Sequence, residues 1–402
     1  MPYVPFHFFV ILFFAVTFGA QIVLYRFVSR YLVSRRAGRK LTRLWLPLAF
    51  VIINLPLLFI RIDGEMFYGG FARTYIMMPF FAYETLSLAV FLAAGLAYGV
   101  KVVFRLLKRI WSNGRTEKAP PVPSESRRSF IRTGAIGLGA YTFLGSLRSI
   151  YDRDEYKVDR VTLPVKNLPH QLDGLTISMI SDIHSGMYML ERDMETYVEA
   201  INHLNADMVF IPGDFVTSKD SEMLPLVKAF SGLKSKYGTY TCLGNHDFFA
   251  NPAYVTKKLR DIGMKVLRNE TEELDLNGAK LMLSGVDDGR HANFPKVSYE
   301  ASSLNTARIL LCHKPYYFEN AVAGNFDLML SGHTHGGQIV LLDLFGVKVT
   351  PATIVSPYVS GKYKLSDALM YVSRGVGTIG LPIRVNCPPE ITLFTLRTKK
   401  SH

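Results

Sequence analysis

Residues 175–184, LTISMISDIH, decide the fold, because an apolar and partly β-branched run ends there in an aspartate and a histidine. Such a run predicts a buried strand, with Asp182 and His184 at its carboxyl end. Two residues apart in an extended chain, both side chains should point to the same side. Four later apolar runs end in polar residues in the same way. They are MVFIP at 208–212, TYTCL at 239–243, ARILLC at 307–312 and FDLMLS at 326–331.

Carboxylate, amide and imidazole side chains follow these five runs. They are Asp182, His184, Asp214, Asn245, His246, Asp247, His313, His333 and His335. Such groups are ligands that borderline divalent metals such as Mn, Fe or Zn accept. The carboxyl ends of strands are also where open α/β sheets bind ligands. A single motif of this kind is as well explained by a turn or a helix cap, but five in this order favour a metal site.

The motif series resembles that of the calcineurin-like metallophosphoesterases, from about Leu175 to the C-terminus. That family shows D-x-H, G-D, G-N-H-D/E, a lone histidine and G-H-x-H in this order, and each motif has a counterpart here. The late segment Ser373 to Glu390 is similar to a membrane-anchored bacterial branch. One departure is visible, since many members have an acid soon after the G-D pair, where residues 215–218 here read FVTS.

The resemblance implies a role for each donor and a pair of divalent ions, Mn, Fe or Zn. Asp182, His184 and His335 would hold one metal, Asn245, His313 and His333 the other, Asp214 would bridge them, and His246 would protonate the leaving group. Neighbouring Asn245 and Asp247 could orient His246 as a general acid, or His246 could lie outside the reacting centre. Two such ions lower the pKa of a shared water and hold both the attacking and the departing oxygen of a phosphate.

Three further residues are candidates for substrate binding. Gln338 follows a Gly-Gly turn and could orient a ligand, or simply lie in a loop. Arg374 and Arg384 lie in glycine-rich turns, where they could clamp a phosphate or pair with Glu390 or an aspartate. The three cysteines share no C-x-x-C spacing and are interpreted as buried thiols rather than a disulfide framework.

The order of predicted elements indicates an α/β domain with mixed strands late in the chain. Predicted strands cover residues 175–181, 207–211, 239–243, 280–284, 307–312, 327–330, 368–373 and 391–396, and predicted helices cover 191–204, 225–233 and 252–262. The resemblance implies a two-sheet sandwich flanked by helices. Residues 151–402 are enough for one such core.

The N-terminal third has a different composition, with nearly uncharged apolar runs at residues 6–25, 44–60 and 75–100. Each is long enough for a bilayer core of about 30 Å at 1.5 Å per residue. We therefore expect an all-α transmembrane region of three spans within residues 1–112. The alternative is a buried helical core, but the runs show no amphipathic stripe.

Charge predicts the orientation of these spans. Up to Arg132 there are 18 Lys and Arg against 5 Asp and Glu, whereas beyond it there are 28 of each. The basic residues cluster after the first and third runs, and the positive-inside rule makes those loops cytoplasmic. A nucleic-acid-binding patch is the alternative. Because the charges flank apolar runs and the catalytic part is neutral, no nucleic-acid partner is expected.

Residues 126–132, SRRSFIR, resemble a twin-arginine export signal, and a glycine-rich apolar stretch follows at 134–147. This stretch is short for a span and fits a signal h-region. Two arginines in a basic flank by chance are the alternative. We expect residues 113–150 to be a basic linker with this signal and a retained apolar anchor, and the translocase to be a partner. The domain of residues 151–402 would then lie outside the cytoplasmic membrane, next to its lipid.

Three functions are compatible with these features. The first is a membrane-anchored phosphodiesterase or phosphatase that hydrolyses an envelope phosphate ester, which could be lipid-linked, using a metal-activated hydroxide. The second, suggested by the resemblance, is a UDP-2,3-diacylglucosamine pyrophosphatase-like enzyme of lipid A synthesis, which would need a cytoplasmic site. The third is a non-catalytic metal-binding module, which should have lost ligands, whereas every expected position is filled.

Overall fold

The structure is a computed structural model, and its contacts divide the chain into two units, residues 1–150 and 151–402. It describes residues 6–34, 41–63, 155–294, 306–340, 342–344, 347–354, 356–380 and 382–399, and scattered positions between 76 and 107. The twin-arginine-like segment 126–132, the apolar stretch 134–147 and much of the third expected span lie outside the described residues.

The first unit contains two long helices, α1 (Phe6–Ser34) and α2 (Leu46–Asp63), with a π-helical turn η1 (Leu41–Trp45) directly before α2. Pro56 lies inside α2. These helices cover the first two expected spans. Within the part of the chain that the structure describes, however, no helix combines the length and the apolar character needed to cross a membrane. The predicted transmembrane region therefore has no support from the described helices.

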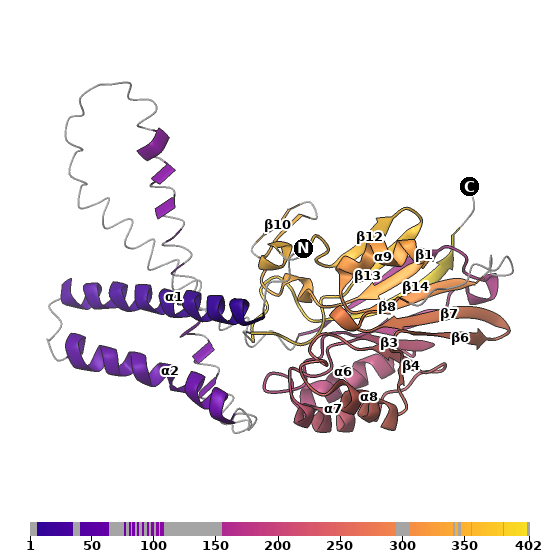
Figure 1. The fold of residues 1–402 in the computed structure, drawn as a ribbon, viewed down its shortest axis with the longest axis horizontal. Helices are drawn as coiled ribbons and strands as arrows, with labels where there is room; N and C mark the ends of the chain where they lie inside the picture. The colour runs from indigo at the N-terminus through magenta and orange to yellow at the C-terminus, as the bar shows by residue number, and fades with distance from the viewer. Residues whose placement is uncertain are drawn as a thin grey trace. The chain divides into compact units, whose positions relative to one another are not determined.

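The second unit is built on two six-stranded sheets (Figure 1). The strands of the first sheet lie in the order β1 (Lys157–Val165), β14 (Glu390–Thr398), β2 (Thr176–Met179), β3 (Met208–Pro212), β4 (Thr239–Cys242) and β5 (Lys265–Val266). Strands β2 to β5 are parallel, whereas β14 runs antiparallel to β2 and parallel to β1. The sheet is therefore mixed only at the edge that the last strand of the chain joins.

The second sheet has the order β12 (Gly361–Leu365), β13 (Ala368–Val372), β9 (Leu328–Ser331), β8 (Ala307–Cys312), β7 (Ala279–Val286) and β6 (Glu270–Leu276). Its four central strands are parallel, and β12 and β6 pair antiparallel at the two edges. A separate two-stranded ribbon joins β10 (Leu342–Leu344) to β11 (Val347–Val349).

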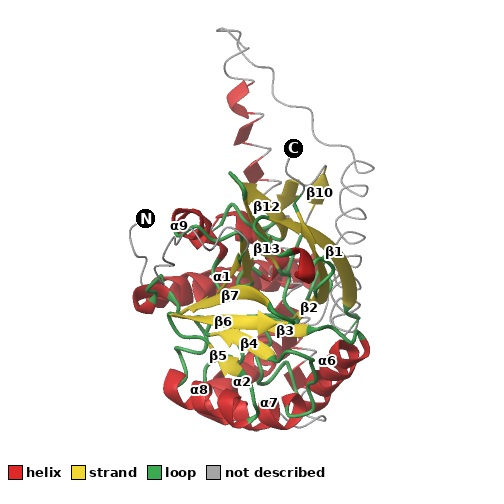
Figure 2. Ribbon diagram, turned by 90° about the vertical axis from the view of Figure 1, so that its right-hand side faces the viewer, coloured by secondary structure: helices red, strands yellow, loops and turns green. Residues whose placement is uncertain are grey.

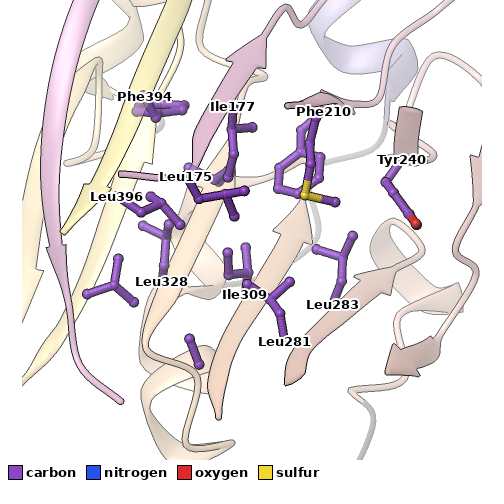
Figure 3. Close-up of a cluster of buried hydrophobic side chains, with 14 of the residues drawn as sticks. Leu175, Ile177, Phe210, Tyr240, Leu281, Leu283, Ile309, Leu328, Phe394 and Leu396 are labelled. Atoms are coloured by element: carbon purple, nitrogen blue, oxygen red, sulfur yellow. The ribbon is translucent and has the colours of Figure 1, made fainter. Parts of the chain in front are cut away.

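Buried side chains from both sheets form one core between them (Figure 3). The position of strand β3 between two cores explains why its sequence is apolar without alternation. Its Met208 and Phe210 belong to the core between the sheets, while Val209 and Ile211 belong to a second core on the outer face. A strand that is covered on both faces loses the polar face that an exposed sheet would keep.

Three helices cover the outer face of the first sheet, α6 (Glu191–His203), α7 (Met223–Phe230) and α8 (Pro252–Asp261) (Figure 2). Helix α8 begins where the Asn251 side chain accepts the amides of Ala253 and Tyr254, a common helix cap. The short helix α9 (Phe318–Ala323) covers the second sheet. Single turns of 3₁₀ helix are η5 (His170–Leu172), η6 (Asp220–Glu222), η7 (Gly289–His291), η9 (Pro315–Tyr317), η10 (His335–Gly337) and η11 (Pro351–Ile354).

The eight predicted strands and three predicted helices all occur, with ends that differ by a few residues. Two mixed sheets with flanking helices confirm the expected fold class for this unit. Strands β1, β5, β6, β10, β11 and β12 were not among the predicted strands. The three longest of them, β1, β6 and β12, lie at sheet edges and carry several exposed residues, so their sequences contain no continuous apolar run.

Candidate metal centre

The site lies in the loops that follow the carboxyl ends of five strands, β2, β3 and β4 in the first sheet and β8 and β9 in the second. These loops carry the predicted donors, and five of the donors are almost completely buried. Those five are Asp182, His184, Asp214, His313 and His335. Burial of so many ionisable side chains requires partners for their charges and lone pairs.

The backbone at the site is left-handed at five donors, Asp182, His184, Asp214, His333 and His335, with φ between 49° and 74°. Such residues cost of order 1–3 kcal/mol each and cluster at functional sites. Strand β2 already ends at Met179. Asp182 and His184 therefore do not lie on one side of an extended strand, and that part of the prediction is wrong. The two side chains converge because the loop turns sharply at each of them.

One group of donors consists of Asp182, His184 and His335, whose ligand atoms all lie within 4.8 Å of one another. The Nε2 atoms of His184 and His335 are 3.1 Å apart. Asp182 Oδ1 lies 3.6 Å from His335 Nε2. These are the three residues that were expected to hold one metal together.

A second group consists of Asp214, His313 and His333. Asp214 Oδ2 lies 3.0 Å from His313 Nε2 and 3.6 Å from His184 Nε2. One carboxylate oxygen therefore faces donors of both groups, as a bridging ligand must. His246 forms a further group with His184 and Asp214, so its ring also borders the centre.

Backbone groups orient the donors. His313 Nδ1 lies 2.7 Å from Pro212 O and His335 Nδ1 lies 3.3 Å from Gly377 O. Because carbonyls only accept, each Nδ1 carries a proton, and each Nε2 is turned toward the centre. The backbone amide of His333 donates to Asp182 Oδ1 at 2.8 Å.

Two glycines are required because side chains of neighbouring loops approach their Cα atoms closely, and not because the backbone needs flexibility there. A Cβ at Gly332 would overlap the Asp182 carboxylate and the Ser181 hydroxyl, and one at Gly244 would overlap the Asp214 carboxylate. The glycines of the G-H-x-H and G-N-H-D motifs therefore make room for the ligands of neighbouring loops.

Electrostatics set the protonation states. Burial lowers the pKa of His335 to about 4 and the pKa of His184 and His333 well below the usual value. For Asp214, burial opposes ionisation, but the nearby His313 and His246 rings hold its pKa well below the usual range. Neutral imidazoles and ionised carboxylates are the forms that bind metals. His313 is the exception, because Asp214 outweighs burial and raises its pKa to about 10.

The residues fit a divalent cation on a further ground. The buried Oδ1 of Asn245, one of the predicted donors, has no hydrogen-bond partner among the described residues. A buried polar atom without a partner costs about 1–3 kcal/mol, so this oxygen points to a ligand that satisfies it.

Arg374 and Arg384, predicted as substrate-binding candidates, instead bond within the protein. Arg374 pairs with Asp159 at 2.7 Å and Glu390 at 3.1 Å, so the alternative of ion pairing describes it. Arg384 is 5% exposed and donates to the carbonyls of Arg374, Gly375, Gly377 and Cys387. A buried guanidinium whose N–H groups donate to backbone carbonyls holds a loop in place and does not bind a phosphate.

Gln338, the third such candidate, has both ends of its amide bonded to Ile379. Its Nε2 donates to Ile379 O at 3.0 Å, and its Oε1 accepts from Ile379 N at 2.9 Å. The side chain therefore joins the turn after His335 to the loop that follows β13. It stiffens the edge of the site.

Asp247 has a different task from the expected one. Its carboxylate accepts the backbone amides of Asp214, Phe215, Val216 and Gly244. It therefore holds two loops together instead of orienting the His246 ring, whose Nδ1 bonds Thr217 O. The cysteines Cys242, Cys312 and Cys387 are free and buried, as expected.

Comparison with known proteins agrees with this geometry. The profile of the calcineurin-like phosphoesterases matches residues 175–337. The chain is 32% identical over 286 residues to the uncharacterized metallophosphoesterase YkuE of Bacillus subtilis, covering 68% of this chain and 98% of that protein. It is 31% identical over 256 residues to the transmembrane protein with metallophosphoesterase domain of Danio rerio, covering 60% of this chain and 57% of that protein. An uncharacterized metallophosphoesterase of Campylobacter jejuni is 32% identical over 280 residues, covering 68% and 71%.

The two-sheet fold and the clustered His and Asp donors define a metal-dependent phosphoric ester hydrolase. The chain belongs to the calcineurin-like metallophosphoesterase family.

Proposed function

We propose that the protein hydrolyses a phosphate ester at a centre of two divalent cations. The observation that carries this proposal is the position of Asp214 Oδ2 between His313 and His184, one from each donor group. Asp182, His184 and His335 would hold one ion, Asn245, His313 and His333 the other, and Asp214 both. When bound, the two ions supply a water of lowered pKa and offset the charge of the phosphate.

The residues of the chain perform the remaining tasks. His246 borders the centre, and its backbone amide donates to Asp214 Oδ1 at 2.8 Å, so its position is fixed relative to the bridging carboxylate. Its Nδ1 donates to Thr217 O, which leaves Nε2 to exchange a proton with the departing oxygen. We therefore assign His246 as the general acid.

Exposed aromatic side chains beside the centre support an amphiphilic, lipid-linked phosphate ester as substrate. Phe249 is 49% exposed, and its ring lies 4.9 Å from that of His246. Tyr316 is 39% exposed and its ring lies 6.1 Å from that of His333. Apolar contacts of this kind suit the hydrocarbon part of an ester held at the metals.

Attachment to the cytoplasmic membrane, with the catalytic unit on its outer side, belongs to the same proposal. It is supported by the apolar runs and the basic residues of positions 1–132, and by the transmembrane name of the Danio rerio relative. The pyrophosphatase alternative would require the catalytic unit to face the cytoplasm instead.

The test is turnover of phosphomonoesters, phosphodiesters and nucleoside-diphosphate sugars by the full-length chain in detergent, loaded with Mn²⁺, Fe²⁺ or Zn²⁺. We expect hydrolysis of at least one ester class, lost on chelation and restored by metal. Hydrolysis of the diphosphate alone would favour the pyrophosphatase. Stoichiometric metal with no turnover of any class would favour a binding module.

A further inference from the structure

His246 is oriented by a backbone carbonyl. Its Nδ1 lies 2.6 Å from Thr217 O, and no carboxylate bonds the ring among the described residues. The sequence explains the absence, since residues 215–218 read FVTS. Whatever fixes the peptide after Thr217 therefore fixes the ring.

That peptide is held by Glu222. One carboxylate oxygen, Oε2, accepts the backbone amides of Thr217 at 2.8 Å, Ser218 at 2.8 Å and Lys219 at 3.0 Å. Glu222 is only 4% exposed, and its own carbonyl accepts the Ser185 hydroxyl at 2.7 Å. Glu222 is thus held both through its side chain and through its backbone.

The Ser218 amide and the Thr217 carbonyl are the two ends of one peptide group. A trans peptide is planar and directs its N–H and its C=O in opposite directions. Glu222 at the N–H end and His246 at the C=O end therefore lie on opposite sides of one peptide dipole. A negative charge at the N–H end polarises the group and strengthens the carbonyl as an acceptor.

We propose that Glu222 is a positioning residue for His246 and acts through the Thr217–Ser218 peptide. The inference rests on the proposed role of His246 as the general acid. The carboxylate fixes the direction of the Thr217 carbonyl, the carbonyl holds the Nδ1–H of His246, and Nε2 is thereby aimed at the departing oxygen. A carboxylate that lies outside the centre in this way assists protonation without contacting substrate or metal.

The competing explanation is that the Glu222 side chain merely caps the start of the turn η6, of which Glu222 is the last residue. A cap would stabilise the fold, but its loss would slow all substrates alike. A residue that positions the general acid affects esters with a poor leaving group more strongly, since a good leaving group departs without a proton.

The experiment compares Glu222→Gln and Glu222→Ala in the full-length chain with an alkyl ester and with its nitrophenyl counterpart. We expect the alkyl ester to slow about 10–100-fold, with the larger loss in Glu222→Ala, and the nitrophenyl ester to slow less than about threefold. Metal content should stay at the wild-type value. The matched control is Asp327→Asn, because Asp327 is also a buried carboxylate that accepts a backbone amide, that of Arg308.

A second measurement is independent of turnover. In the zinc-loaded chain, the Nδ1 proton of His246 should give a downfield NMR resonance that moves upfield in Glu222→Gln and stays in Asp327→Asn. Equal slowing of both esters, loss of metal, or an unmoved resonance would overturn the role of Glu222. If the wild type hydrolyses neither ester, the proposed function fails, and the resonance alone still decides whether Glu222 acts on His246.

Discussion

The Nε2 atoms of His184 and His335 face each other at 3.1 Å. Burial lowers the pKa of both rings, so both are uncharged and do not repel each other. The two residues are 151 positions apart in the sequence and come from loops of different sheets. His335 Nδ1 donates to Gly377 O, so the proton shared between the two Nε2 atoms belongs to His184. A divalent cation would replace that proton and bind both rings, so this contact joins the two halves of the sandwich at the centre.

Asp214→Asn should abolish turnover and lower the metal content. The bridging position would lose its negative charge between two cations, while the size of the side chain stays the same. Metal analysis by mass spectrometry and turnover in excess metal check this. Normal metal content in an active Asp214→Asn chain would contradict the bridging role.

His246→Ala should keep the metal content and slow the reaction by about 10²–10⁴-fold, the usual contribution of a general acid. A nitrophenyl ester should recover part of the rate, because its leaving group needs less protonation. His246 also groups with His184 and Asp214 as a possible ligand. The loss of one ion in His246→Ala would therefore assign it to the metal instead.

Arg384→Met should destabilise the catalytic unit by about 3 kcal/mol or more, because several buried carbonyls lose their donor together. Metal affinity should also fall, since Gly377 O accepts from both Arg384 and His335. Thermal unfolding and metal titration measure the two effects. The control is Arg397→Met, which removes an exposed pair with Asp173 and should leave the unfolding temperature almost unchanged. Equal effects of the two substitutions would refute the assignment.

A reporter fused after Tyr151 should lie outside the cytoplasm, and one fused after Arg115 inside it, if the charge distribution sets the topology. Replacing Arg127 and Arg128 together by Lys should retain the catalytic unit inside if the twin-arginine route is used. Reporter activity in intact cells measures both. A wild-type catalytic unit found inside the cytoplasm would favour the pyrophosphatase alternative. Export that is unaffected by the double substitution would refute only the twin-arginine route.

The donor set could be predicted from the sequence because each ligand directly follows an apolar run. Strand ends are local features, and a residue directly next to one, such as His313 after β8, inherits a position from the strand itself. The arginines could not be predicted in the same way. The sequence gives Arg384 a glycine-rich neighbourhood, but only folding shows that the four carbonyls around it satisfy the guanidinium.

The sequence by itself determined the family and, through that resemblance, the expected two-sheet class and the candidate donors, since the motifs that carry the resemblance are short local patterns. Tertiary structure alone decided which atoms meet. His184 and His335 approach each other, Asp214 faces both donor groups, and Glu222 reaches His246 through a peptide. These relationships arise between loops that turn sharply at left-handed residues and lie far apart in the chain. Their geometry depends on how the two sheets are packed, and no local pattern encodes that packing.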